Sequence, residues 1–114
     1  SIRSRVPRFV EGRLPDLNLG SADGGRCAPG LQTAAEQVLL AAPGFSAVSN
    51  GRFKGGSITR RHGQPEQGRH ALQLEIAQAC YMDEAPPWAW NPRQAQPLIA
   101  VLQRLIDALL DWRP

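Results

Sequence analysis

The chain has 114 residues, of which 42% are hydrophobic and 20% are charged. This composition is typical of one globular domain with a modest core, so we expect a single domain over residues 1–114. The net charge is only +3, no apolar run is long enough to cross a membrane, and residues 1–13 lack the apolar core of a signal peptide. We therefore expect a cytoplasmic protein that does not bind membranes.

Basic residues are concentrated in the first part of the chain. Residues 1–70 contain ten Lys and Arg against five Asp and Glu, whereas residues 71–114 contain three against five. All the basic residues except Lys54 are arginine, whose planar fork binds a carboxylate with two hydrogen bonds. This pattern suits a small anionic ligand, although ordinary surface solvation explains most of these arginines taken one at a time. Nucleic acid is not expected, because Phe53 is the one aromatic residue within the basic stretch 50–62.

Glycine and proline divide the first half into short elements. Residues 1–27 predict loops with short extended pieces, and Pro29 opens a predicted helix that runs to about Ala42. Residues 45–49 predict a strand that ends at a tight turn, and residues 57–61 predict a second strand after two glycines.

The second half contains one ambiguous segment and one clear helix. Over residues 70–82 the residue types slightly favour a helix, whereas apolar residues at 72, 74 and 76 alternate as in a strand. Asn91 is a good helix cap and Pro92 suits the first helical turn. The apolar face of this last helix is predicted to bury Leu98, Val101, Leu102, Leu105, Ile106 and Leu109. Cys27 and Cys80 match no metal-binding spacing and are expected to be buried, reduced thiols.

No complete catalytic set is present in the sequence. The chain has only two histidines, at 62 and 70, and it lacks the motifs of zinc proteases, serine hydrolases and phosphate-binding loops. A partial set of polar residues lies within thirteen positions, and it could bind an anion at the ends of strands or simply form a solvated loop. Its members are Asn50, Arg52, Lys54, Arg60, Arg61 and His62.

Glu75 is the candidate for proton transfer. A carboxylate beside an activated water can take its proton and deliver it to a leaving amine. On a strand, Glu75 would share a face with Gln73 and the small Ala71, which leaves room for a substrate. On a helix, Glu75 would be an ordinary charge facing solvent.

Three blocks of the sequence, in this order, resemble the C-terminal part of N-formylglutamate amidohydrolases. They are SIRSRVPRFVEGRLPDLNLGSADGGRC, NGRFKGGSITRRHG and HALQLEIAQACYM. The resemblance implies a relative of the zinc carboxypeptidases and aspartoacylase-type deacylases, with a three-layer α/β/α sandwich around a mixed sheet. It also implies a zinc-dependent hydrolysis of N-formyl-L-glutamate to formate and L-glutamate, a step of histidine breakdown.

The resemblance assigns roles to individual residues. HALQLEIAQ resembles the strand that carries the general base, which makes Glu75 that base and implies a strand over 70–76, with a helix only after about Ala77. The block from 50 to 63 resembles the substrate-binding region. The residues that it implies for the carboxylates of the substrate are Arg60 first, then Asn50, Arg52 and Lys54. Arg3 is a further residue expected to face the site, and for His70 a place in the pocket and a purely structural role are both open.

The resemblance also implies what lies outside the sequence. SIRS resembles the segment that follows the last metal-binding histidine of the family, so the zinc ligands are expected upstream of Ser1 and none within this chain. We therefore expect the chain to be part of a longer domain, which the missing initiator Met also favours. The sequence departs from the family at Ser57, Arg61 and His62, where an aromatic residue, a histidine and a tyrosine are expected. Two alternatives remain open, namely a fragment without activity and a small arginine-rich anion-binding module.

Overall fold

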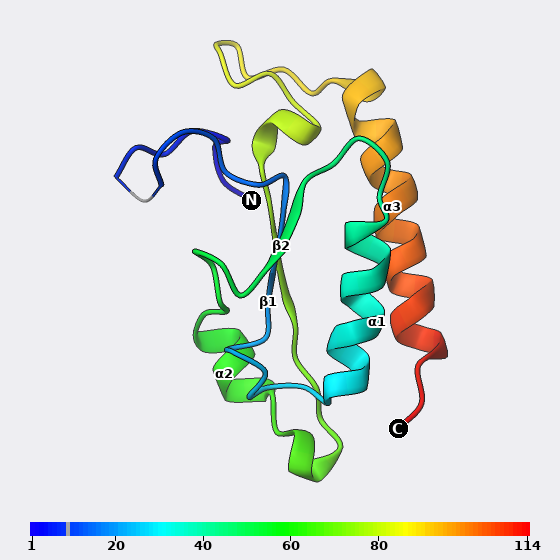
Figure 1. Ribbon diagram of the computed structural model, residues 1–114. Helices are drawn as coiled ribbons and strands as arrows, with labels where there is room; N and C mark the ends of the chain where they lie inside the picture. The colour runs from blue at the N-terminus through cyan, green and yellow to red at the C-terminus, as the bar shows by residue number, and fades with distance from the viewer. Residues whose placement is uncertain (9) are drawn as a thin grey trace.

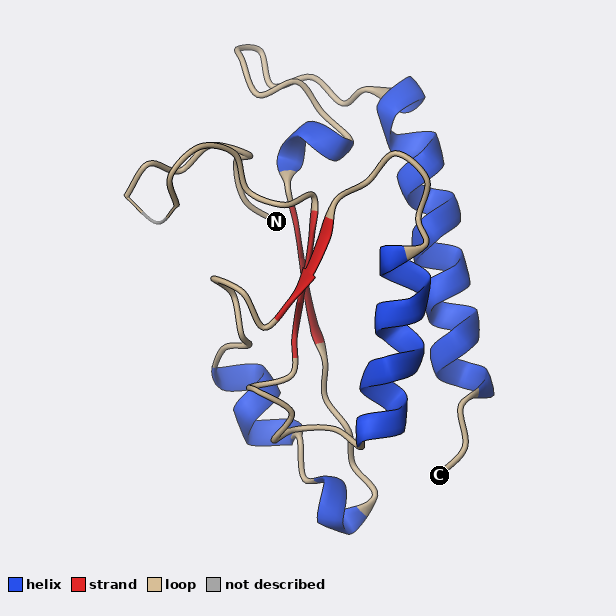
Figure 2. Cartoon of the chain, viewed as in Figure 1, coloured by secondary structure: helices blue, strands red, loops and turns tan. Residues whose placement is uncertain are grey.

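A small mixed sheet with two long helices along one side forms the centre of the computed structural model, which describes residues 1–8 and 10–114 (Figure 1). Short helices and long loops occupy the ends of the sheet and its other side (Figure 2). The strands are β1 (Leu17–Gly20), β2 (Ala47–Ser49) and β3 (Gln73–Ile76); the α-helices are α1 (Pro29–Leu40), α2 (Ser57–His62) and α3 (Pro92–Asp111); and the 3₁₀ turns are η1 (Pro65–Gln67) and η2 (Gln78–Cys80).

The sheet has the strand order β2-β1-β3. β1 runs parallel to β2 and antiparallel to β3, with Asn18 directly opposite Glu75. The predicted α/β class with a mixed sheet is therefore confirmed, and β1 is one of the short extended pieces expected within residues 1–27. Phe9, which the same prediction covered, lies outside the described residues.

The two faces of the sheet have different environments because side chains alternate along each strand. Leu17 and Leu19 of β1 belong to the core, and Leu74 and Ile76 of β3 pack against it. Figure 1 shows α1 and α3 on one side of the sheet and α2 on the other. The alternation places Asn18, Gln73 and Glu75 on the side away from α1 and α3. The helices contribute to the core through Ala35 and Leu39 of α1 and Leu98, Val101 and Leu105 of α3.

The long helices begin where the sequence predicts. Pro29 occupies the first turn of α1, and Asn91 caps α3 by accepting a hydrogen bond from the backbone N–H of Gln94 at 3.3 Å. Three of the six apolar residues predicted to be buried on α3 are buried, and Leu102 and Leu109 pack partly against the core. Ile106 was wrongly predicted, since 51% of its surface is exposed. It follows the buried Leu105 by 100° around the helix, which turns it away from the core.

The strand predicted over residues 57–61 is wrong, because Ser57–His62 form helix α2. Hydrogen bonds from Arg60 N–H to Gly56 O and from Gly63 N–H to Thr59 O close its turns. Thr59 is buried and packs against Gly55, so a tertiary contact overrides the strand preference of its β-branched side chain. The basic side chains of Arg60 and Arg61 also lie in the last turn, where the helix dipole favours positive charge.

The ambiguous segment 70–82 is a strand followed by a single 3₁₀ turn. β3 covers Gln73–Ile76, which agrees with the alternating pattern rather than with the slight preference for a helix. η2 takes the place of the helix expected after Ala77. Cys80 at its end and Cys27 are both free and buried, as predicted. Burial raises the pKa of the Cys80 thiol to about 12 and also raises the pKa of Cys27.

The search for membrane-spanning segments gave a negative result. Among the helices of the described residues, none combines the length and the apolar character that a bilayer crossing requires.

Candidate functional site

Glu75 lies on the edge strand β3, next to the N-terminus, on the face of the sheet away from α1 and α3, which we call the open face. Its Oε1 atom is 2.7 Å from the amino nitrogen of Ser1, and 22% of its side chain is exposed. Hydrogen bonds from Ile2 N–H to Ile76 O and from Gln78 N–H to Ile2 O hold the first residues alongside β3 in a parallel bridge. The position of Glu75 on a strand agrees with the family resemblance rather than with the slight preference of the residue types for a helix.

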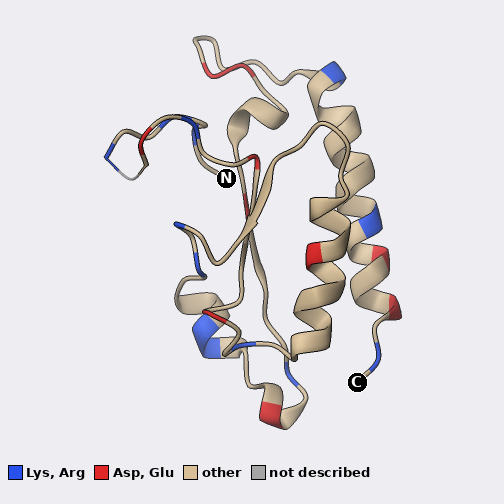
Figure 3. Cartoon of the chain, in the orientation of Figure 1, with Lys and Arg blue, Asp and Glu red and all other residues tan. Residues whose placement is uncertain are grey.

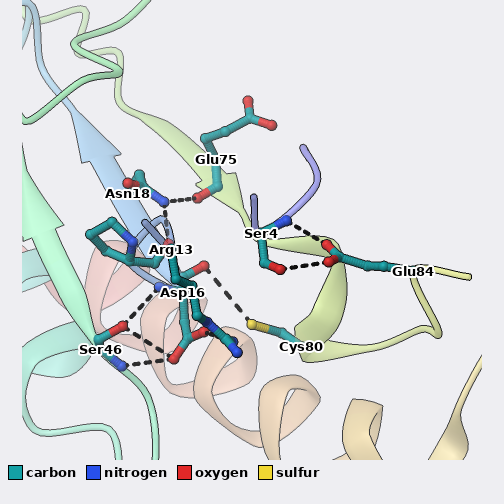
Figure 4. Close-up of polar contacts among 9 residues, drawn as sticks. Ser4, Arg13, Asp16, Asn18, Ser46, Glu75, Cys80 and Glu84 are labelled. Carbon is teal, nitrogen blue, oxygen red and sulfur yellow. Dashed lines mark hydrogen bonds and ion pairs between the residues drawn. The ribbon is translucent and has the colours of Figure 1, made fainter. Parts of the chain in front are cut away.

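A second contact fixes the N-terminal segment near Glu75. The backbone N–H and the hydroxyl of Ser4 both donate hydrogen bonds to the carboxylate of Glu84, in the loop after η2 (Figure 4). Burial opposes ionisation of Glu84, but the two bonds from Ser4 outweigh it and lower the pKa of this carboxyl group. Since the two residues are 80 positions apart, sequence reasoning did not identify this contact.

Asn18 supports Glu75 from the neighbouring strand. Its Nδ2 atom donates hydrogen bonds to the carbonyl oxygens of Pro15, at 2.7 Å, and Glu75, at 3.2 Å (Figure 4). Only 1% of Asn18 is exposed. No local pattern pointed to this contact, because Asn18 lies between leucines on a short strand and its partner is 57 positions away.

A cavity of about 450 Å³ lies farther along the same face. Gln73 forms one wall, two residues before Glu75 and on the same side of β3. The loop between β2 and α2, together with α2 itself, forms the remaining walls. The lining residues are Gly51, Arg52, Phe53, Lys54, Gly55, Gly56, Arg60 and Gln73.

The cavity keeps its shape because the loop 51–56 is held tightly against the sheet. A Cβ atom on Gly20 would lie 2.6 Å from the carbonyl carbon of Lys54, so only glycine allows this approach. The backbone N–H of Ala22 donates to Lys54 O, and Gly56 N–H donates to Oε1 of Gln73 at 3.0 Å. These bonds connect the loop to both β1 and β3.

The lining of the cavity is positively charged. Arg52, Lys54 and Arg60 contribute to it, and no acidic residue does. Figure 3 shows Lys and Arg on the loop before α2 and on α2 itself. Lys54 also pairs with Asp23 at 3.1 Å. Three cations without a lining carboxylate can bind a small anion, and the arginine forks suit a carboxylate in particular.

The structure places the other predicted substrate-binding residues outside this cavity. Asn50 has a φ angle of 50° and accepts hydrogen bonds from the backbone N–H groups of Ser21 and Asp23, so it shapes the turn after β2. The guanidinium carbon of Arg3 lies 4.7 Å from the ring centre of Trp88, a cation–π contact in a different loop.

His70 also has structural contacts. Its Nδ1 atom accepts a hydrogen bond from the backbone N–H of Ala28 at 3.2 Å, and its ring packs edge-on against Trp112 at 5.3 Å. It lines a separate hollow together with Arg61 and His62. Of the predicted set, the structure thus brings Arg52, Lys54 and Arg60 together.

The described part of the chain was searched for residues that could hold a metal ion. Within residues 1–8 and 10–114, no three side chains of His, Cys, Asp or Glu come close enough together to hold an ion. Glu75 faces the amino group of Ser1 and not a set of ligands. The residues present therefore do not fit a complete zinc centre.

Comparisons with known proteins agree on one family. The family model described as N-formylglutamate amidohydrolase matches residues 1–82. Over 112 residues the chain is 54% identical to an N-formylglutamate deformylase of Pseudomonas aeruginosa and 48% identical to one of Pseudomonas putida. Each match covers 98% of this chain but 42% of the relative, so the chain spans well under half of their length.

A solved structure also resembles the chain. The crystal structure of N-formylglutamate amidohydrolase from Ralstonia eutropha JMP134 matches with a TM-score of 0.71 and 30% sequence identity. The match covers 91% of this chain and 35% of the other. Most of this chain therefore has a structural counterpart in a longer protein.

Proposed function

Because this chain belongs to the N-formylglutamate amidohydrolase family, we propose that the protein containing it hydrolyses N-formyl-L-glutamate to formate and L-glutamate. The observation that carries the proposal is the arrangement of Glu75. Its carboxylate lies on the open face of the sheet, beside Ser1 and on the same side of β3 as the basic cavity.

Glu75 is the general base and acid of the proposed reaction. Its carboxylate takes a proton from the attacking water as the oxygen adds to the formyl carbon. The same proton then passes to the nitrogen of the leaving glutamate as the carbon–nitrogen bond breaks. The role requires a carboxylate that is held in place and still accessible, and a half-buried position on a strand supports both requirements.

The basic cavity binds the glutamyl part of the substrate in this proposal. N-formyl-L-glutamate carries two carboxylates, and the cavity offers Arg60, Arg52 and Lys54. Arg60 is the first choice, because within the described residues its side chain makes no hydrogen bond or ion pair and so remains available to a ligand. Gln73 connects the two parts of the site, since it lines the cavity and precedes Glu75 by two residues.

The proposal includes features that only a longer protein can supply. A zinc ion would polarise the formyl carbonyl and activate water, and its ligands would come from residues outside this sequence. We also propose that the complete domain is a three-layer α/β/α sandwich, and that the enzyme acts in the cytoplasm, in histidine breakdown. In this proposal the 114-residue chain alone has no activity, because the zinc ligands would lie outside it.

Release of formate from N-formyl-L-glutamate tests the proposal. The full-length gene product that contains this sequence should release one formate for each substrate consumed, both as purified and with added zinc, whereas the 114-residue chain should release none. Absence of formate from the full-length protein, with and without zinc, would refute the proposed function.

A further inference from the structure

We infer that Asn18 is a positioning residue of the proposed hydrolase, acting through the backbone of Glu75. The inference rests on the proposed function and adds a residue to which neither the comparisons nor the sequence assigns a role. The starting observation is that one side-chain amide reaches two carbonyl oxygens, those of Pro15 and Glu75, from a position that is 1% exposed.

The orientation of this amide is determined by its partners. Two carbonyl oxygens can accept hydrogen bonds only from the NH₂ end of an amide. The Oδ1 atom of Asn18 is left without a partner, and among the described residues it is the one buried side-chain N or O atom in that state. An unpaired buried acceptor opposes folding, so part of what the two donated hydrogen bonds contribute to stability is offset at this position.

The hydrogen bond from Asn18 reaches the strand that carries the proposed base. Asn18 is on β1, the central strand, and is the cross-strand partner of Glu75. β3 has β1 as its one strand neighbour among the described residues. The hydrogen bond goes to the main-chain carbonyl of Glu75 and does not involve its carboxylate, which points away from Asn18 (Figure 4). Asn18 therefore links the backbone that carries the base to the central strand and to the turn at Pro15.

Replacing Asn18 by leucine tests the positioning role. Leucine has a similar shape and removes the unpaired oxygen, but it also leaves the carbonyl oxygens of Pro15 and Glu75 without this donor, so the melting temperature should fall. The loss of stability is therefore matched by a control variant, described below. A small displacement of a reacting group lowers turnover strongly, by up to ~100-fold for about 1 Å. In the full-length enzyme, Asn18→Leu should therefore lower kcat by roughly 10- to 100-fold and leave the KM for N-formyl-L-glutamate nearly unchanged.

Two comparisons distinguish this role from a purely structural one. Val101 of α3 is 1% exposed and belongs to the core on the side of the sheet that faces α1 and α3. Val101→Ala removes buried volume there, so it should lower the melting temperature and leave kcat unchanged. In a Glu75→Gln background, Asn18→Leu should cause no further loss of turnover, because a positioning residue acts through the group that it positions. If Asn18→Leu does not accumulate as folded protein, Asn18→Ser, which keeps a donor for one carbonyl, should have an intermediate kcat.

Each outcome of this experiment is decisive. An unchanged kcat in Asn18→Leu or Asn18→Ser would overturn the inference and leave the proposed function intact. The same loss of turnover with and without Glu75 would also overturn it. A wild-type enzyme that releases no formate would refute the proposed function, and it would be recognised before any variant is compared.

Discussion

The amino nitrogen of Ser1 and Oε1 of Glu75 are 2.7 Å apart, although the two residues are separated by most of the chain. The parallel bridge between Ile2 and Ala77 produces this contact, because it directs the first residue along β3 towards the carboxylate. Any residue joined to the nitrogen of Ser1 would thus begin beside Glu75.

The pair between Ser1 and Glu75 should contribute little to stability. Its two partners are 30% and 22% exposed, and pairs that water can reach are worth about 0–1 kcal/mol. Glu75→Gln should therefore change the free energy of unfolding of the 114-residue chain by less than about 1 kcal/mol in urea titrations. A loss above about 2 kcal/mol would mean that Glu75 has a structural role.

Gly20→Ala should disturb the cavity. The new Cβ atom would meet the backbone of Lys54 and Gly55 at 2.6 and 2.7 Å, so we expect a loss of roughly 1–3 kcal/mol in urea unfolding. The displaced loop should also raise the KM of the full-length enzyme. Gly56→Ala is the matched control, because its Cβ atom would lie 3.7 Å from its nearest neighbour, Oε1 of Gln73. Equal stabilities for the two variants would contradict the close approach.

Arg60→Gln should weaken substrate binding. A hydrogen bond between charged groups contributes about 1.5–3 kcal/mol, so steady-state kinetics should show KM raised by roughly 10- to 100-fold. Arg61→Gln is the control, since its side chain lines a different hollow. Should Arg61→Gln raise KM as much as Arg60→Gln, the carboxylates of the substrate bind elsewhere.

Stability should fall in acid through Asp16. Burial raises the pKa of this carboxyl group, but hydrogen bonds from Ser46 and Arg13 outweigh burial and give a net lowered pKa. Because the folded pKa lies below the unfolded value of about 3.9, the contribution of Asp16 is complete above that pH. It is lost as the pH falls through the folded pKa.

Asp16→Asn tests this assignment. The variant cannot ionise at this position, so its free energy of unfolding should depend less on pH below about pH 4 than that of the wild type. Urea titrations at several pH values between neutrality and acid would measure both slopes. Parallel curves for the two proteins would show that another carboxylate is responsible.

The elements that the sequence predicted correctly depend on local signals. Asn91 and Pro92 start α3 through a cap and a fixed backbone angle, and Pro29 does the same for α1. Helix α2 was missed because its conformation depends on the burial of Thr59 against Gly55. The residue types at positions 73–76 are compatible with a helix or with a strand, and it is the pairing with β1 that makes this segment a strand.

The basic cavity was predictable from the sequence only where its residues are close together in the chain. Arg52, Lys54 and Arg60 line one cavity, as their spacing within a single block indicated. Asn50 and His70 were predicted to join them, but their polar atoms make structural hydrogen bonds with residues far away in the sequence. Asn50 accepts one from Ser21 and His70 accepts one from Ala28. Asn18 had no local signal, since its hydrogen bond reaches across 57 positions.

Turnover of N-formyl-L-glutamate by the Glu75→Gln variant of the full-length enzyme tests the central claim most directly. Glutamine keeps the size and polarity of the side chain but cannot carry the proton, so kcat should fall by about 100- to 10,000-fold while the protein stays folded and its metal content is unchanged. A variant that releases formate at the wild-type rate would contradict the assignment of Glu75 as the base.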